Sequence, residues 1–184
     1  TINAGSLAVS TSANLGAAPG TVDADNIIFN GGTLNTTSTF TLNLNKGITL
    51  TGSGTINTDS ETTLTYGGVI SGDSNLTKTG SGTLTLSGNN TYSGATTVSA
   101  GTLKNGVTGV LYDGTAVTVA SGATWDLNDF AETVGSIAGD GNITLGSATL
   151  TAGGDNSSTA FSGVMSETGG FTKTGSGTLT LSGN

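Results

Sequence analysis

The sequence contains no cysteine and no histidine, and it has a single proline, Pro19, in 184 residues. Without cysteine the chain can form neither a disulfide framework nor a thiolate metal site. Without histidine it cannot hold a Ser–His–Asp triad, because that mechanism needs an imidazole to take the serine proton. No stretch shows the 3.6-residue apolar period of an amphipathic helix, so helices of useful length are not expected.

Charged side chains are also scarce. They make up 9% of the chain, against roughly 25% in typical globular proteins. The basic residues are four scattered lysines, Lys46, Lys78, Lys104 and Lys173, and the formal net charge is −8. Nucleic acid and anionic lipid both require clustered positive charge, so neither is an expected partner. No apolar run approaches the roughly 20 residues of a membrane helix, so we expect no membrane insertion by this segment.

Glycine, threonine and serine are abundant instead, with 32 glycines in the chain. Leucine, valine and isoleucine recur at alternate positions between glycine-rich turns, which is the period of a half-buried strand. Threonine favours strands as well, because a β-branched side chain fits a pleated surface. The composition therefore predicts an all-β protein with many short strands.

A block of thirteen residues, TKTGSGTLTLSGN, occurs at Thr77–Asn89 and again at Thr172–Asn184. Within the first copy Leu84 and Leu86 share one face of a short strand, and glycine-rich turns bound that strand on both sides. Such self-similarity at a fixed offset is the mark of a repeat architecture.

Weaker matches extend the repeat into two modules. Residues 1–7 match residues 97–103, so we divide the chain into module 1 (1–89), a connecting coil segment (90–96) and module 2 (97–184). No signal peptide is visible at Thr1, where the chain opens directly in repeat-like sequence. We therefore expect one continuous solenoid that forms part of a longer tandem array.

A finer rhythm of about 20 residues appears inside the modules, with a short strand entered through glycine at each beat. The clearest series starts at Gly82-Thr83-Leu84 and continues at Leu103, Trp125 and Ile143. Strands this short must stack on one another to bury an apolar face, which predicts a right-handed parallel β-helix. About nine coils would give a rod on the order of 43 Å long, with leucine, isoleucine, valine and the aromatic residues inside.

The stretch Leu76–Leu103, LTKTGSGTLTLSGNNTYSGATTVSAGTL, resembles the passenger-associated repeat of bacterial autotransporters, and partial copies stand at Phe171–Asn184 and Thr1–Leu7. The resemblance implies a β-helical stalk that is secreted across the outer membrane of a Gram-negative bacterium and displayed on the cell surface. It also implies a signal peptide and a C-terminal membrane barrel elsewhere in such a protein.

Catalytic candidates in the sequence are weak. Gly72-Asp73-Ser74 looks like the start of a serine protease motif, but Asn75 follows where glycine is expected and the chain lacks histidine. Glycosidases need two carboxylates that face each other across a groove. The close acid pairs are Asp23/Asp25, Asp59/Glu61 and Asp126/Asp129. Asp23 and Asp25 could share one face of an extended strand, but a pair at this spacing is interpreted as solvated surface. We predict no enzyme activity, no catalytic residue and no cofactor.

Three further patterns in the sequence are candidate binding sites. Gly139-Asp140-Gly141-Asn142 and Asp126-Leu127-Asn128-Asp129 contain oxygen ligands but lack the spacing of known calcium loops, so no metal ligand is named. Threonine pairs at spacing two would organise water only if they stacked on one face in every coil. The sequence intervals between these pairs are uneven, which indicates that the threonines are ordinary strand-forming residues. The pairs are Thr49/Thr51, Thr63/Thr65, Thr83/Thr85, Thr149/Thr151 and Thr178/Thr180. Sequons that can accept sugar in a secreted protein stand at Asn35, Asn75, Asn89, Asn142 and Asn156.

The sequence thus predicts a structural or adhesive segment of a surface-exposed, autotransporter-type protein. Neighbouring coils of the same protein are its expected partners, and host or bacterial surface glycans or proteins are possible ones. Two alternatives remain open: a self-associating extracellular filament, since both ends of the stack would expose strand edges, or a scaffold for an enzyme domain located outside this chain.

Overall fold

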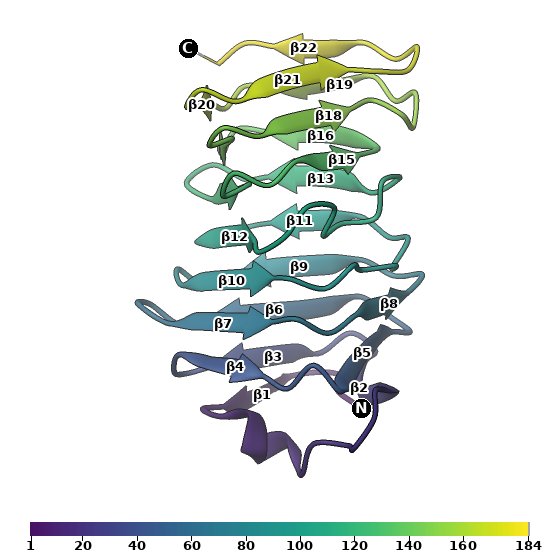
Figure 1. The fold of residues 1–184 in the computed structure, drawn as a ribbon, viewed down its shortest axis with the longest axis vertical. Coiled ribbons are helices and arrows are strands. Elements are labelled where there is room, and N and C mark those ends of the chain that lie inside the picture. The colour runs from purple at the N-terminus through teal and green to yellow at the C-terminus, as the bar shows by residue number, and fades with distance from the viewer. Residues whose placement is uncertain (184) are drawn as a thin grey trace.

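A computed structural model describes residues 1–183, and Asn184, the last residue of the second repeat copy, lies outside the described residues. The chain winds into a β-solenoid of about 8 turns with about 21 residues per turn. In Figure 1 the strands nearer the viewer run to the right and those behind run to the left while the chain climbs, which is a right-handed coil. The β-helix is confirmed. The solenoid has about 8 coils where about nine were expected. The number is smaller because the first coil is longer than the rest, as the pairing of Ser6 with Thr33 shows.

Every coil contributes to up to three faces of the solenoid, which follow one another in the order 1, 2, 3 along the chain. In the described residues face 1 is a nine-stranded parallel sheet of β1 (Ser6–Val9), β3 (Thr33–Thr36), β6 (Gly54–Thr58), β9 (Leu76–Thr79), β11 (Thr96–Val98), β13 (Ala116–Val119), β16 (Ser136–Gly139), β19 (Thr159–Phe161) and β22 (Leu179–Leu181).

Face 2 is the second long sheet. Its strands within residues 1–183 are β4 (Phe40–Leu42), β7 (Thr63–Tyr66), β10 (Thr83–Leu86), β12 (Thr102–Asn105), β14 (Thr124–Asp126), β17 (Asn142–Thr144) and β20 (Met165–Ser166). Below β4 lies a 3-10 helix, η1 (Ser12–Leu15), which takes the place of a face 2 strand in the first coil.

Face 3 consists of two separate three-stranded sheets. The first holds β2 (Asp23–Phe29), β5 (Lys46–Leu50) and β8 (Ile70–Gly72), and the second holds β15 (Glu132–Val134), β18 (Thr149–Ala152) and β21 (Gly170–Lys173). Between them the chain passes twice without strand structure, at residues 90–93 and 109–111. These passes are nevertheless hydrogen-bonded to each other and to the flanking sheets, from Thr91 N to Ile70 O at 2.9 Å and from Gly109 N to Ala131 O at 3.1 Å.

The core is a set of columns in which equivalent side chains stack at every turn. On face 2 the register places Leu84 between Leu64 and Leu103. The column continues through Trp125 and Ile143, and all five side chains are fully or almost fully buried. The 20-residue series from Leu84 to Ile143 is therefore confirmed. Since strand positions alternate, the threonines between these residues point outward.

The glycines at the corners allow neighbouring coils to approach closely. A Cβ on Gly88 would lie 1.9 Å from the carbonyl oxygen of Gly68 in the coil below, which is far inside van der Waals contact. The same arrangement recurs where Gly183 lies over the carbonyl oxygen of Gly163. By contrast, a Cβ on Gly67 would meet no atom within 4 Å. Side chains at the stacked corners would thus push the coils apart.

We expect Gly88→Ala to lower the free energy of unfolding by about 1–3 kcal/mol, because the added methyl group overpacks a corner that cannot yield without moving the backbone. Gly67→Ala, at the residue next to Gly68, is the matched control. It should change the free energy of unfolding by less than about 0.5 kcal/mol. Urea unfolding followed by circular dichroism measures both. Equal effects of the two substitutions would contradict the corner contact.

Candidate functional site

The charged pairs singled out in the sequence lie at separate surface positions. Asp23 and Asp25 are exposed on the edge strand β2, where the Asp25 backbone N–H donates to Asp23 Oδ1 at 3.3 Å. Asp59 and Glu61 belong to the turn after β6, and Glu61 has a positive φ of 60°. Among residues 1–183 no group of three or more histidine, cysteine, aspartate or glutamate side chains is placed to hold a metal ion.

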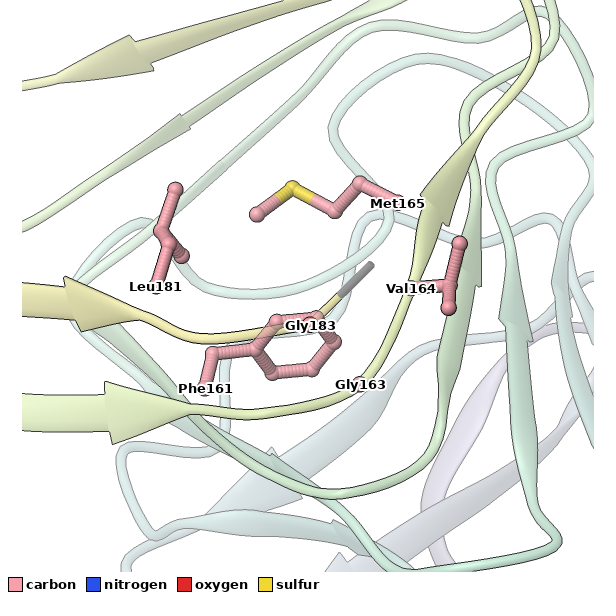
Figure 2. A pocket seen from close by; sticks show the side chains of 6 residues that line it. All are labelled: Phe161, Gly163, Val164, Met165, Leu181 and Gly183. Atoms are coloured by element: carbon pink, nitrogen blue, oxygen red, sulfur yellow. The ribbon is translucent and has the colours of Figure 1, made fainter.

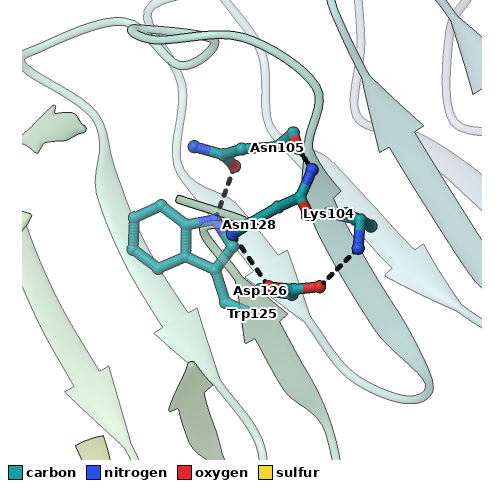
Figure 3. Close-up of polar contacts among 5 residues, drawn as sticks. All are labelled: Lys104, Asn105, Trp125, Asp126 and Asn128. Carbon is teal, nitrogen blue, oxygen red and sulfur yellow. Dashed lines mark hydrogen bonds and ion pairs between the residues drawn. The ribbon is translucent and has the colours of Figure 1, made fainter. Parts of the chain in front are cut away.

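Asp126 and Asp129 each have a structural partner. Asp126 Oδ2 accepts from Lys104 Nζ at 2.9 Å, and its Oδ1 accepts from the Asn128 N–H at 2.8 Å (Figure 3). Asp129 Oδ1 accepts from the backbone N–H of Ser147 at 2.7 Å and from its hydroxyl at 3.0 Å. These hydrogen bonds from Ser147 lower the pKa of Asp129. Both carboxylates therefore stabilise the contact with an adjacent coil.

The other candidate residues form local corner contacts. Ser74 Oγ donates to Asp73 Oδ1 at 3.4 Å on the surface. Asp140, in the Gly139–Asn142 segment, accepts from the Ser162 hydroxyl of the next coil. Of the sequons, Asn35 accepts from Asn57 in a ladder on face 1, and Asn75 Oδ1 accepts from the Ala95 N–H at 2.8 Å. The threonine pairs Thr63/Thr65 and Thr83/Thr85 do stack on face 2, whereas Thr149/Thr151 lies on face 3.

Polar side chains inside the solenoid were not anticipated from the sequence. Where face 3 lacks strands, Asn90 and Glu132 hold the backbone of Val110 from both sides. Asn90 Oδ1 accepts from the Ile70 N–H at 2.8 Å, and its Nδ2 donates to Val110 O at 2.7 Å. Glu132 Oε2 accepts from the Val110 N–H at 2.9 Å. The two buried side chains thus add to the backbone hydrogen bonds that join these coils where face 3 lacks strands.

A buried network extends this contact to face 2. Asn105 Nδ2 donates to Glu132 Oε2 at 2.8 Å, and Asn105 Oδ1 accepts from Trp125 Nε1 at 3.0 Å. Figure 3 shows Asn105 next to the Trp125 ring, with Asn128 close by, and Asn128 Nδ2 donates to Asn105 O at 3.1 Å. Glu132 is 2% exposed, and this burial raises its pKa to about 7, against the opposing hydrogen bonds from Val110, Leu111, Thr133 and Asn105. The network keeps a titratable group in the core.

Lysine ammonium groups also act inside the fold. Lys78 Nζ donates to the carbonyl oxygens of Thr79 at 2.7 Å and Gly80 at 2.8 Å, and burial lowers its pKa to about 8. Lys46 Nζ donates to Leu15 O at 3.0 Å and Gly16 O at 2.8 Å, which fixes the end of η1. Two of the four positive charges are therefore buried, and the remaining surface is predominantly acidic.

An alignment of the face 2 strands contains the signal for part of this network. Asn105 occupies in TLKN the inward position that Leu86 occupies in TLTL. Glu132 lies two residues before Val134 on β15, so both side chains face inward. A polar residue at an inward strand position indicates a buried hydrogen-bonding role. The partner of each residue, however, depends on loop paths that the alternation does not encode.

The described residues include no helix of the length and apolarity needed to cross a membrane. The model of the passenger-associated-transport-repeat family matches residues 76–104 and 171–184. The chain is also 41% identical over 94 residues, 48% of its length, to a protein of Brucella suis biovar 1 (strain 1330) named adhesin BmaC autotransporter. It spans only 3% of the length of that relative. No solved structure matches the chain significantly.

We expect the free energy of unfolding to fall as the pH rises from about 4.5 through 7. The folded state holds a proton on Glu132 in this range, since its pKa is about 7, and the unfolded state does not. Glu132→Gln should remove this pH dependence, because the amide mimics the protonated acid and keeps an oxygen toward Val110. Glu132→Leu should destabilise the protein by about 1–3 kcal/mol, because it leaves buried donors without an acceptor.

Denaturant unfolding at pH 5 and pH 7.5, below the pKa of about 8 of Lys78, measures these effects. The exposed Glu61→Gln is the control, and it should retain the pH dependence of the unsubstituted protein. If the Glu132→Gln protein kept the same dependence on pH, the assignment to Glu132 would be wrong.

Proposed function

We propose that this chain, a repeat-bearing segment of an autotransporter passenger, acts as a rigid structural and adhesive section of a surface-exposed protein, without enzymatic activity. The single observation that supports this most strongly is the unbroken nine-stranded sheet of face 1, which extends from β1 to β22 in the described residues. Nine paired strands have eight spacings of about 4.8 Å, so the solenoid separates its two ends by about 38 Å. The two sequence repeats are consistent with the exported, cell-surface part of such a protein.

The outer surface is suited to a spacer that also makes weak contacts. Face 1 presents a column of five consecutive threonines, at Thr33, Thr55, Thr77, Thr97 and Thr118. Threonine side chains make this surface polar but uncharged. Their hydroxyl groups can form hydrogen bonds with a ligand. A non-enzymatic role accords with the relative's name as an adhesin, and the carboxylates of the close acid pairs do not face one another across a groove.

An exposed aromatic residue marks a contact point for adhesion. Tyr112 is 47% exposed in the loop between β12 and β13. A turn supports it, since the Thr115 N–H donates to Tyr112 O at 2.9 Å, and the ring lies beside Gly114. A supported, exposed tyrosine offers a flat apolar ring with a polar end, which suits contact with surface glycans or proteins. We include Tyr112 in the proposed adhesive surface.

Rigidity is tested with spin labels, which the absence of native cysteine makes straightforward. In a Ser6→Cys/Thr180→Cys variant, double electron–electron resonance should give one narrow distance distribution centred near 38 Å, from eight strand spacings of about 4.8 Å. Ser6→Cys/Thr118→Cys is the matched control at five spacings, about 24 Å. A broad distribution, or distances that do not scale with the number of coils, would contradict a rigid spacer.

Adhesion is tested with beads that carry the purified chain. They should bind immobilised host matrix proteins or glycans more strongly than albumin-coated beads do, and Tyr112→Ala should reduce that binding at least twofold without changing stability. Leu44→Ala, at another exposed apolar residue, serves as the control substitution. Binding no stronger than that of albumin beads would remove the adhesive part of the proposal and leave the spacer.

A further inference from the structure

Asparagine is followed directly by glycine at two places in the sequence, Asn30-Gly31 and Asn105-Gly106. In this dipeptide the glycine amide nitrogen can attack the side-chain amide carbon of the asparagine, because glycine has no side chain to hinder the approach. Asn30 is exposed in the bend after β2, whereas Asn105 is completely buried at the end of β12. The chain therefore carries one such pair on its surface and one at its core.

The reaction converts the asparagine amide into a carboxylate, and it needs only water. A bond forms between Gly106 N and Asn105 Cγ, the Cγ–Nδ2 bond breaks, and the Nδ2 group leaves as ammonia with the proton of the Gly106 amide. Water then opens the resulting succinimide ring at one of its two carbonyl groups. The product is aspartate at position 105 or isoaspartate, in which the backbone passes through the former side chain and is one methylene group longer.

The folded structure restrains both reacting groups. The Gly106 N–H donates to Leu86 O at 2.7 Å, so the pairing between coils occupies the attacking nitrogen. Asn105 Oδ1 accepts from Trp125 Nε1 at 3.0 Å (Figure 3), and Asn105 Nδ2 donates to Glu132 Oε2 at 2.8 Å. Ring closure has to break these hydrogen bonds and move a buried side chain. The native fold therefore protects Asn105, and unfolding removes that protection.

A carboxylate at position 105 does not suit this environment. The Asn105 Nδ2 group now donates to Glu132, but an aspartate oxygen in its place would face the Glu132 carboxylate. Two carboxylates this close disfavour each other's ionised form strongly. The adjacent Lys104 faces outward and pairs with Asp126 at 2.9 Å. Isoaspartate adds a second disturbance, because its extra backbone atom lies within the pairing of β12 with β10.

The interior along face 2 is largely apolar around this position. Leu86 is the inward residue paired with Asn105, and Leu103 is the other inward residue of β12. Farther along the same face, Met165 of β20 lines a pocket together with Phe161 and Leu181 (Figure 2). An interior of this kind stabilises a further charge poorly.

The exposed pair provides a comparison within the same molecule. Asn30 Nδ2 donates to Asn3 Oδ1 at 3.2 Å on the surface. Water can solvate a carboxylate at this position, so the same reaction at Asn30 should cost little stability. The two sites thus share one chemistry and differ in what the fold makes of the product.

We propose that Asn105-Gly106 is a deamidation site that the native fold protects, and that its reaction in the unfolded chain removes much of the stability of the fold. A chain that folds promptly keeps the hydrogen bonds of Asn105 to Trp125 and Glu132. A chain that stays unfolded acquires a carboxylate or an isoaspartate at the same place. This property is independent of the proposed adhesive role, because it concerns only the interior of the solenoid.

The test keeps the full chain at pH 7.5 and 37 °C, either folded or unfolded in guanidinium chloride. Peptide mapping by mass spectrometry follows deamidation at Asn105 and at Asn30. We expect deamidation at Asn105 to be at least about tenfold slower in the folded protein than in the unfolded chain. Equal rates of deamidation at Asn105 in the two samples would overturn the proposal.

The effect on folding is measured with the same unfolded samples after partial conversion. They are diluted to the denaturant concentration at which half of the intact protein is folded, and a short pulse of protease then removes the unfolded chains. Chains deamidated at Asn105 should be depleted at least about tenfold among the survivors, because an unpaired buried charge weighs heavily against the native state. Chains deamidated at Asn30 should survive like intact ones. Survival of chains deamidated at Asn105 in undiminished proportion would also overturn the proposal.

Two substitutions reproduce the aspartate product directly and form a matched pair. Asn105→Asp should lower the midpoint of denaturant unfolding or prevent folding, whereas Asn30→Asp should leave the midpoint nearly unchanged. Circular dichroism measures both. Equal midpoints for the two variants would contradict the role of the buried site, and the protease experiment, which needs no substitution, decides the question even if Asn105→Asp does not fold.

Discussion

The hydrogen bonding of each coil to the next is the constraint on which the rest of the structure depends. Because parallel strands pair in register at every turn, each side chain lies above its equivalent about 21 residues earlier. An inward position must therefore suit the whole column, as Leu64, Leu84 and Leu103 do on face 2. The corners must let backbone approach backbone, which explains glycines such as Gly88. High threonine and glycine content with little charge follows from these two demands.

The repeated block encodes a corner and the strands beside it, and the same block serves on different faces. In the first copy TKTG ends β9 on face 1, and in the second copy it ends β21 on face 3. The local geometry is nevertheless retained. Gly80 and Gly175 have φ values of 72° and 67°, and both Lys78 and Lys173 donate to the carbonyl oxygens of the next two residues. Strand residues alternate between inward and outward positions on every face, so the same block fits any of the three faces. A repeat of 95 residues therefore need not contain a whole number of turns. The division into modules 1–89 and 97–184 stays a prediction.

Sequence reasoning anticipated the features that depend on local periodicity. The alternation at Leu84 and Leu86 and the series to Ile143 follow directly from pattern, and both hold in the structure. The buried roles of Asn90 and Glu132 could not be anticipated in the same way, because they depend on two coils that lack a strand on face 3. The contact of η1 with β4 was missed for a related reason: a four-residue helix has no period to detect.

The most direct test of the in-register stack is disulfide cross-linking between engineered cysteines on face 2. The register pairs Thr83 with Thr102 and Thr102 with Thr124. The Thr83→Cys/Thr102→Cys variant should form an intramolecular disulfide rapidly, because directly paired strand positions lie about 5 Å apart. Thr83→Cys/Thr124→Cys, which spans two strand spacings or about 10 Å, should not. Rapid cross-linking of the second pair, or failure of the first, would contradict the stack of coils.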